Sequence, residues 1–432
     1  MSSPYSRRQR LAQALKSKFA VDSAFNLVSV GLLAVSGLAL NFIIAAKFGA
    51  QTLGAFNIVY SIYVVVVQLA SMGVQASCLK YAAEFSSDEE RLSSLLTAAL
   101  VLTVFSATVV SAALVLCAGT LGRIYGSDAI AEGILWVIPG LWCFALNKLL
   151  MGVVNGLRRM KAYAAFTSVR SLMLLAGIVV CAVSHVPGEK LTMVISAAEL
   201  VLLASLLVYT ADLIRFKNIG GIREWVRRHA VFGLKSISLG IMSEVGCRLD
   251  ILLLGYFAGE YQVGVYSFAA MLVEGFNQLP FVFRRNMDPI LTQMIVSGQK
   301  DELLGIIKRG LRLGLVGMSL VGAVSVAVYP ALVRWVVGNP VFMNGWGVFA
   351  VLMTGAVIQA TYLPFSGILV QGGYPGYQTI MILGMVLVNL ALGVTLIPFF
   401  GALGAAVAAA AAYASTVLFL KVLVRRVLGV EI

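Results

Sequence analysis

Residues 48–57 read FGAQTLGAFN, and residues 257–267 read FAGEYQVGVYS. Each stretch joins two long apolar segments and contains a glycine, Gly54 or Gly264, that is flanked by apolar residues on both sides. The two glycines are 210 residues apart, close to half of the 432-residue chain. The sequence therefore contains an internal repeat, with one copy in each half.

The composition of the chain places it in a membrane. Hydrophobic residues make up 60% of the sequence, charged residues make up 12%, and the mean hydropathy is +0.94. Soluble domains are about 45–50% apolar and about 25% charged. These values exclude disordered, collagen-like and disulfide-scaffold proteins. The five cysteines are dispersed without a CxxC pattern, and the two histidines fall near expected loops, so neither a metal site nor a cofactor is predicted.

Apolar segments of membrane-spanning length recur along the whole chain. A helix crosses about 30 Å of hydrocarbon in about 20 residues. The expected spans are 24–46, 53–75, 93–118, 129–154, 162–184, 191–213, 230–254, 262–283, 304–328, 344–370, 376–398 and 400–424.

Basic residues are distributed unevenly between the expected loops. With the N-terminus in the cytoplasm, 24 Lys and Arg residues fall in termini and cytoplasmic loops, and 4 fall in outer loops. This follows the positive-inside rule and explains most of the net charge of +13 without a nucleic-acid partner. The expected parts are a basic cytoplasmic segment (1–23), an N-lobe (24–213), a cytoplasmic linker (214–229), a C-lobe (230–424) and a cytoplasmic C-terminus (425–432).

The repeat and the spans together predict the fold class. Six spans separate the two copies, and this even number gives both halves the same orientation, which is a parallel repeat. We expect an all-α integral membrane protein of about 12 transmembrane helices, in two six-helix lobes around a central cleft. This arrangement favours a transporter with alternating access over a repeat that serves helix packing alone.

Two short motifs carry a family resemblance. Residues 249–257 read LDILLLGYF and lead into the motif Val263-Gly264-Val265-Tyr266, while the first half has residues 48–57 followed by Gly73-Val74 and Lys80-Tyr81. Both resemble polysaccharide flippases of the Wzx type, in the multidrug/oligosaccharidyl-lipid/polysaccharide exporter superfamily. The resemblance implies two bundles of six helices and export of a lipid-linked oligosaccharide. Arg248 precedes Asp250 here, whereas the family's basic residue follows the acidic one, so neither inherits a role.

Four basic residues that are not part of this 24-to-4 count lie inside expected spans. Lys148 and Arg170 fall about 9 Å and about 12 Å from the cytoplasmic ends of consecutive helices. They predict a cationic vestibule that binds a diphosphate; the alternative is snorkelling to the headgroups. Lys235 is nearer the surface, where snorkelling is as good an explanation. Arg248 could bind substrate or pair with Glu244 one turn earlier.

Polar residues on the second span follow a helical register. They are Asn57, Ser61, Gln68, Ser71 and Gln75, and Gln278 on the eighth span corresponds to Gln68 by the 210-residue offset. Such a stripe predicts a wet cleft whose side chains bind sugar hydroxyls, with hydrogen bonding between helices as the alternative.

Acidic residues within the spans are candidates for coupling to an ion. Glu244, Glu274 and Asp250 could bind a coupling proton or cation, or serve as neutral helix contacts. Glu199 has no partner that its depth suggests.

The predicted function is therefore that of a flippase for a lipid-linked, polyprenyl-diphosphate oligosaccharide in the cytoplasmic (inner) membrane. No bond is broken, so we expect no catalytic residues. Partners would be the anionic lipid-linked substrate, membrane lipids, H⁺ or Na⁺, and polysaccharide polymerase machinery. One alternative is a cation-coupled multidrug exporter of the same superfamily. Another is a membrane glycosyl polymerase or ligase, against which the short outer loops argue.

Overall fold

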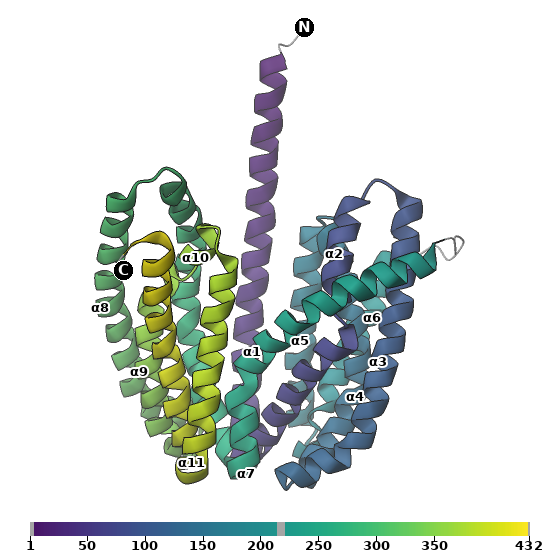
Figure 1. Cartoon of the computed structure of the whole chain (residues 1–432). Helices are drawn as coiled ribbons and strands as arrows, with labels where there is room; N and C mark the ends of the chain where they lie inside the picture. The colour runs from purple at the N-terminus through teal and green to yellow at the C-terminus, as the bar shows by residue number, and fades with distance from the viewer. Residues whose placement is uncertain (1–3, 214–220, 431–432) are drawn as a thin grey trace. The chain divides into compact units, whose positions relative to one another are not determined.

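The computed structural model describes residues 4–213 and 221–430, and it is built from helices (Figure 1). The other residues, which include part of the expected linker and both ends of the chain, lie outside this description. The described elements are α1 (Pro4–Ser71), α2 (Val74–Glu84), α3 (Glu89–Tyr125), α4 (Asp128–Gly156), α5 (Met160–Val183), η1 (Gly188–Lys190), α6 (Met193–Thr210), η2 (Ala211–Leu213), α7 (Ile222–Val296), α8 (Lys300–Leu332), η3 (Val333–Val337), η4 (Pro340–Gly345), α9 (Trp346–Tyr362), η5 (Leu363–Phe365), α10 (Ile368–Gln371) and α11 (Pro375–Leu428).

The expected membrane spans lie on these helices. In the part of the chain that the structure describes, eight helical segments are long and apolar enough to cross a membrane. Helices α1 and α11 each contain two expected spans joined at a kink, at Gly49 (φ 84°) and Gly401 (φ 54°). Helix α7 is not among the eight; it has a third kink, at Gly259 (φ 78°), and also contains two expected spans. The prediction of an all-α membrane protein is confirmed.

The two copies of the repeat have matching backbones. Gly49 and Gly259 are 210 residues apart and share the same extended conformation with positive φ, near φ 80° and ψ 180°, which favours glycine. A Cβ added to Gly54 would overlap the carbonyl oxygen of Glu260, and one added to Gly264 would overlap that of Ala50. These two contacts exchange under the same 210-residue offset. The quoted motifs therefore mark a reciprocal helix crossing that only glycine permits.

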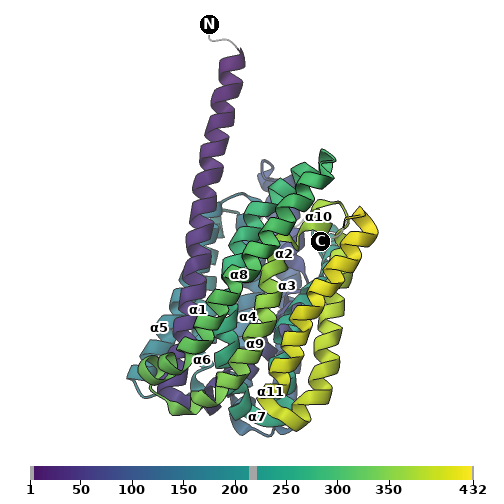
Figure 2. The same ribbon diagram turned by 90° about the vertical axis from the view of Figure 1, so that its left-hand side faces the viewer.

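The chain divides into two compact units. Unit 1 comprises Met1–Leu40, Ile62–Gly122 and Ala131–Ser243, and unit 2 comprises Asn41–Ser61, Arg123–Ile130 and Glu244–Ile432. The core of unit 1 is built from α2, α3, α4 and α6, with Leu95 and Leu150 completely buried. In unit 2, α9 packs against both α8 and α11 (Figure 2). The expected lobe boundaries at 24–213 and 230–424 remain predictions.

Candidate functional site

Unit 1 brings two of the expected substrate-binding cations onto one aromatic ring. Lys148 and Phe144 are one turn apart on α4, so they share a face. The Lys148 Nζ atom lies 5.9 Å from the centre of the Phe144 ring, and the Arg170 guanidinium, from α5, lies 4.5 Å from it. Both distances suit cation–π attraction. Lys148 and Arg170, which were predicted at similar depth on consecutive helices, therefore lie close to each other in the structure.

Arg170 has a carboxylate partner that the sequence analysis lacked. Its Nε atom lies 2.6 Å from Oε1 of Glu199 on α6, which is fully buried. The Tyr63 hydroxyl donates to the same oxygen at 3.2 Å, and the Asn147 amide donates to Oε2 at 2.9 Å. Asn147 also donates to the backbone carbonyl of Glu199 at 2.9 Å. Glu199 thus has a clear role, which is to hold the guanidinium.

Lys148 is bound on its other side by a neutral group. Its Nζ donates a 2.6 Å hydrogen bond to Oε1 of Gln68, a member of the predicted polar stripe. Two cations, Lys148 and Arg170, therefore meet at the Phe144 ring, and Arg170 also pairs with Glu199. Amide and hydroxyl donors lie around them. Such a site suits an anion, since a charge left in a membrane interior is costly. We refer to Gln68, Phe144, Lys148, Arg170 and Glu199 as the cationic cluster.

The rest of the polar stripe is mostly buried. Asn57 donates to the Leu53 carbonyl at 3.0 Å and to Asn41 Oδ1 at 3.4 Å. The Ser71 hydroxyl donates to the Gln68 carbonyl at 3.3 Å.

Other members of the stripe differ in their exposure. Ser61 is fully buried, and among the described residues its hydroxyl has no hydrogen-bond partner. Gln75 is half-buried, and its backbone contacts Gly152 closely. Gln278 is exposed. Gln68 alone among the six joins the cationic cluster, and sugar binding by the others remains a prediction.

A second group of charges lies in unit 2. Asp250 accepts a hydrogen bond from the Tyr266 hydroxyl and another from the Ile251 backbone N–H at 2.9 Å. Arg248 lies over the Tyr60 ring, 5.4 Å from its centre, and interacts electrostatically with Asp250 and Glu274. Within the described part of the chain, no group of three or more His, Cys, Asp or Glu residues could hold a metal ion. Two expected coupling carboxylates thus share one basic neighbour.

Lys235 and Glu244 are placed differently. Lys235 is exposed and lines a pocket with Tyr81 and Phe232, apart from the contacts of the cationic cluster. Glu244 is half-buried at the point where α7 enters unit 2. Their roles in substrate binding and coupling remain predictions.

Sequence reasoning missed Phe144 in the cationic cluster and the two side chains, Asn147 and Tyr63, that hydrogen-bond to its Glu199. Phe144 could have been found, because it precedes Lys148 by four residues on one helical face. Asn147 and Tyr63 gave no comparable signal, because they meet Glu199 only through tertiary packing.

The sequence of the chain matches the model of one protein family. The model of the polysaccharide biosynthesis protein family covers residues 20–283, more than half of the chain. The chain belongs to this family. The matched range includes every residue of the cationic cluster, and also Arg248, Asp250 and Glu274. No curated protein sequence matches the chain.

Solved structures with the same fold are transporters. This family member resembles the lipid II flippase MurJ in an inward closed conformation, at 13% identity and a TM-score of 0.73, over 93% of this chain and 87% of that one. It resembles a MATE-family multidrug resistance transporter in an inward-facing conformation, at 11% identity and a TM-score of 0.74, over 94% and 98%. A third match is a transporter of the MOP superfamily from Pyrococcus furiosus, at 10% identity and a TM-score of 0.61, over 92% of each chain. The fold is therefore that of a MOP-type membrane transporter, as predicted.

Proposed function

We propose that the chain flips a lipid-linked oligosaccharide, carried on a polyprenyl diphosphate, across the cytoplasmic membrane by alternating access. The observation that carries this proposal is the cationic cluster, in which Arg170 and Lys148 both contact the Phe144 ring. Two neighbouring cations at membrane depth suit an anionic group such as a diphosphate. Membership of the polysaccharide biosynthesis family supports a sugar-bearing substrate.

Arg170 and Lys148 would bind the diphosphate in different ways. Glu199 fixes Arg170 through Nε, so Glu199 is a positioning residue that aims a planar donor fork, suited to phosphate oxygens. Lys148 donates to the neutral Gln68 amide and would exchange that bond for a phosphate oxygen. The polyprenyl tail would stay in lipid, and no bond would be made or broken.

The charges of unit 2 would couple transport to an ion. Asp250 and Glu274 share Arg248 as a neighbour, so a proton or sodium ion bound by either carboxylate would change the local charge balance. This is also the observation that favours the second candidate, a cation-coupled multidrug exporter, to which the fold is equally suited. The two neighbouring cations of the cationic cluster oppose that reading, because many drugs are cations.

A complementation experiment separates these two functions. The chain would be expressed in cells that lack their own oligosaccharide flippase, and in cells that lack their drug exporters. We expect restored polymer export in the first strain and unchanged resistance to cationic drugs in the second. Raised drug resistance without polymer export would overturn the proposal in favour of the exporter.

Topology is a separate part of the proposal. The charge bias places both termini and the linker at 214–229 in the cytoplasm. Reporter fusions after residue 220 and at the C-terminus should both report a cytoplasmic position. An outside position for either would contradict the proposed orientation of the transporter.

A further inference from the structure

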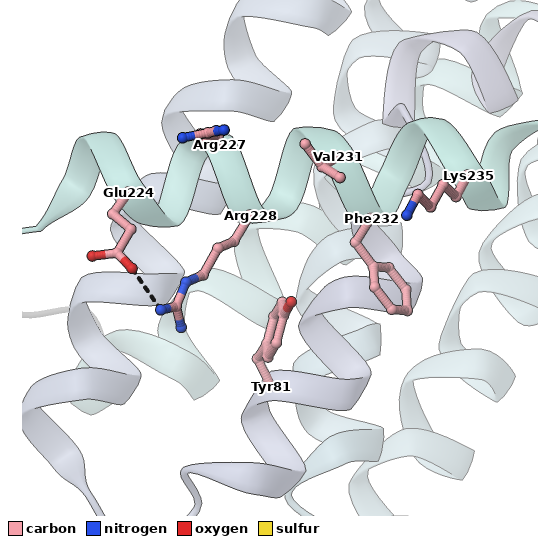
Figure 3. A pocket seen from close by; sticks show the side chains of 7 residues that line it. All are labelled: Tyr81, Glu224, Arg227, Arg228, Val231, Phe232 and Lys235. Atoms are coloured by element: carbon pink, nitrogen blue, oxygen red, sulfur yellow. Dashed lines mark hydrogen bonds and ion pairs between the residues drawn. The ribbon is translucent and has the colours of Figure 1, made fainter.

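The first part of α7 forms one wall of a basic pocket in unit 1. The pocket has a volume of about 450 Å³, and its lining residues are Tyr81 on α2 and Glu224, Arg227, Arg228, Val231, Phe232 and Lys235 on α7 (Figure 3). Arg228 and Lys235 stand at opposite ends of a floor made by the Tyr81 and Phe232 rings, whereas Arg227 points away from that floor. Lys80, on α2, lies over both rings, at 5.2 Å and 5.3 Å from their centres.

The inner face of this segment is firmly packed, so the pocket is preformed. Trp225 is buried, and His229 is fully buried with its ring nitrogens 2.7 Å from the Ser77 hydroxyl and 3.1 Å from the Leu95 carbonyl. One turn further along, a Cβ on Gly233 would overlap the Met72 carbonyl oxygen. The spacing of four residues between Trp225, His229 and Gly233 directs this stripe inward and the basic stripe outward.

The pocket carries excess positive charge. Arg228 pairs with Glu224 at 2.5 Å and stacks over Trp225 at 4.9 Å, which fixes its guanidinium in place. Among the described residues, Arg227 and Lys235 have no carboxylate partner. His229 adds no charge at neutral pH, because burial lowers its pKa to about 4. Arg228, Lys235 and Lys80 therefore lie at the pocket with one carboxylate, Glu224.

Apolar side chains beside these cations indicate that the ligand belongs to the membrane. Val231 is 49% exposed and Leu234 is 59% exposed on the same outer part of α7. A helix that shows basic and apolar side chains together is typical of the membrane–water interface, where each basic residue attracts anionic lipid. A free phosphate ion would leave Val231 and Leu234 in water.

We propose that this pocket binds the phosphate headgroup of an anionic phospholipid, between Arg228 and Lys235, with its acyl chains against Val231 and Leu234. The lipid would hold the start of α7 at the membrane surface. This site is separate from the cationic cluster, and the proposal does not depend on which substrate the protein transports.

The test uses the purified full-length protein and phosphatidylglycerol as the probe. Binding would be measured in lipid nanodiscs by native mass spectrometry and by titration with a short-chain phosphatidylglycerol. The test variant is Arg228→Gln/Lys235→Gln, and the matched control is Lys308→Gln/Arg312→Gln, an exposed basic pair on α8. We expect roughly thirty-fold weaker phosphatidylglycerol binding in the test variant and no change in the control.

Two further measurements distinguish a lipid phosphate group from a free phosphate ion. Inorganic phosphate at the same concentration should not displace the lipid, and short-chain phosphatidylcholine should bind far more weakly. Unchanged lipid binding in the test variant would overturn the proposal, and so would equal displacement by inorganic phosphate, which would indicate a free-anion site. Should the double variant fold poorly, Lys235→Glu alone would repeat the test, because Lys235 has no carboxylate partner in the described structure.

Discussion

Arg170 and Glu199 form an ion pair in which the Arg170 Nε atom lies 2.6 Å from Oε1 of a fully buried carboxylate. The pair joins α5 to α6 and fixes the guanidinium above the Phe144 ring. Because of this pair, a substitution of Arg170 affects folding as well as transport. Removing the guanidinium would strand a buried carboxylate, so a loss of transport would be confounded with a loss of folding.

The first prediction concerns the stability of this pair. Arg170→Gln should lower the free energy of unfolding by about 3–5 kcal/mol, because Glu199 remains buried without its counter-charge. The double variant Arg170→Gln/Glu199→Gln should recover most of that loss. Thermal unfolding in detergent measures both. The control is Arg91→Gln, which breaks an exposed pair with Asp88 and should cost less than about 1 kcal/mol. Equal losses in the single and double variants would contradict a buried-charge effect.

The second prediction isolates substrate binding from folding. Lys148→Gln removes the ammonium that contacts Gln68 and the Phe144 ring and replaces it with an uncharged amide. We expect at least tenfold slower polymer export with a normal amount of folded protein, as lost ion contacts are worth about 1.5–3 kcal/mol. The matched control is Lys161→Gln, which removes an exposed lysine 5.5 Å from the Phe25 ring. Export that survives in Lys148→Gln would remove this residue from the proposed site.

The third prediction tests the reciprocal helix crossing. Gly54→Ala and Gly264→Ala should each reduce the yield of folded protein strongly and to a similar degree, because each methyl group would overlap a backbone carbonyl of the other copy. Gly317→Ala on α8 is the control, since nothing lies within 4 Å of its added carbon. Size-exclusion chromatography of detergent extracts gives the yields. Normal folding of Gly54→Ala would mean that the crossing can separate without cost.

The fourth prediction is a pH dependence at His229, which lies in the expected linker and not in a membrane span. Burial lowers its pKa to about 4, while in the unfolded chain it is about 6.5. Between these values the unfolded state binds more protons, so this contribution is complete above pH 6.5 and is lost as the pH falls toward 4, by up to about 3 kcal/mol. Hydrogen exchange of residues 222–235 should therefore speed up at pH 5 relative to pH 7.5.

A substitution separates His229 from other titrating groups. His229→Gln keeps a hydrogen-bonding side chain without a charge near pH 5, so exchange of this segment should lose its pH dependence beyond the intrinsic change. An equally large acceleration in His229→Gln would show that another group is responsible.

The fold was predictable because its determinants repeat and are local. Apolar length, charge asymmetry and the 210-residue offset of Gly54 and Gly264 are all readable along the chain. The same offset relates the kinks at Gly49 and Gly259, which the structure shows. The sequence alone does not show why Gly54 and Gly264 must be glycine. The reason is a close approach to a backbone carbonyl of the other copy of the repeat.

The site was predictable only in part. Counting residues from the cytoplasmic ends of the expected spans placed Lys148 and Arg170 at a similar depth on consecutive helices, which predicted that they lie near each other. It failed to join Arg170 to Glu199, since an error of about 2–4 residues in each span boundary shifts depth by several ångströms. The predicted helical register of the polar stripe holds from Asn57 to Ser71 on α1, but Met72 (φ 45°) and Gly73 (φ 65°) break the helix, and Gln75 lies on α2. Periodicity also cannot distinguish a face that packs, as at Asn57 and Ser61, from one that binds a ligand.

The most direct test of the central claim is a flipping assay with purified protein in liposomes. A fluorescent polyprenyl-diphosphate oligosaccharide would be reconstituted into both leaflets, and an impermeant quencher would be added outside. The account predicts that the protein exposes inner-leaflet lipid to the quencher well above the rate of protein-free liposomes, that Lys148→Gln slows this at least tenfold, and that Lys161→Gln does not. Exposure no faster than in protein-free liposomes, with transport of a cationic drug by the same preparation, would contradict it.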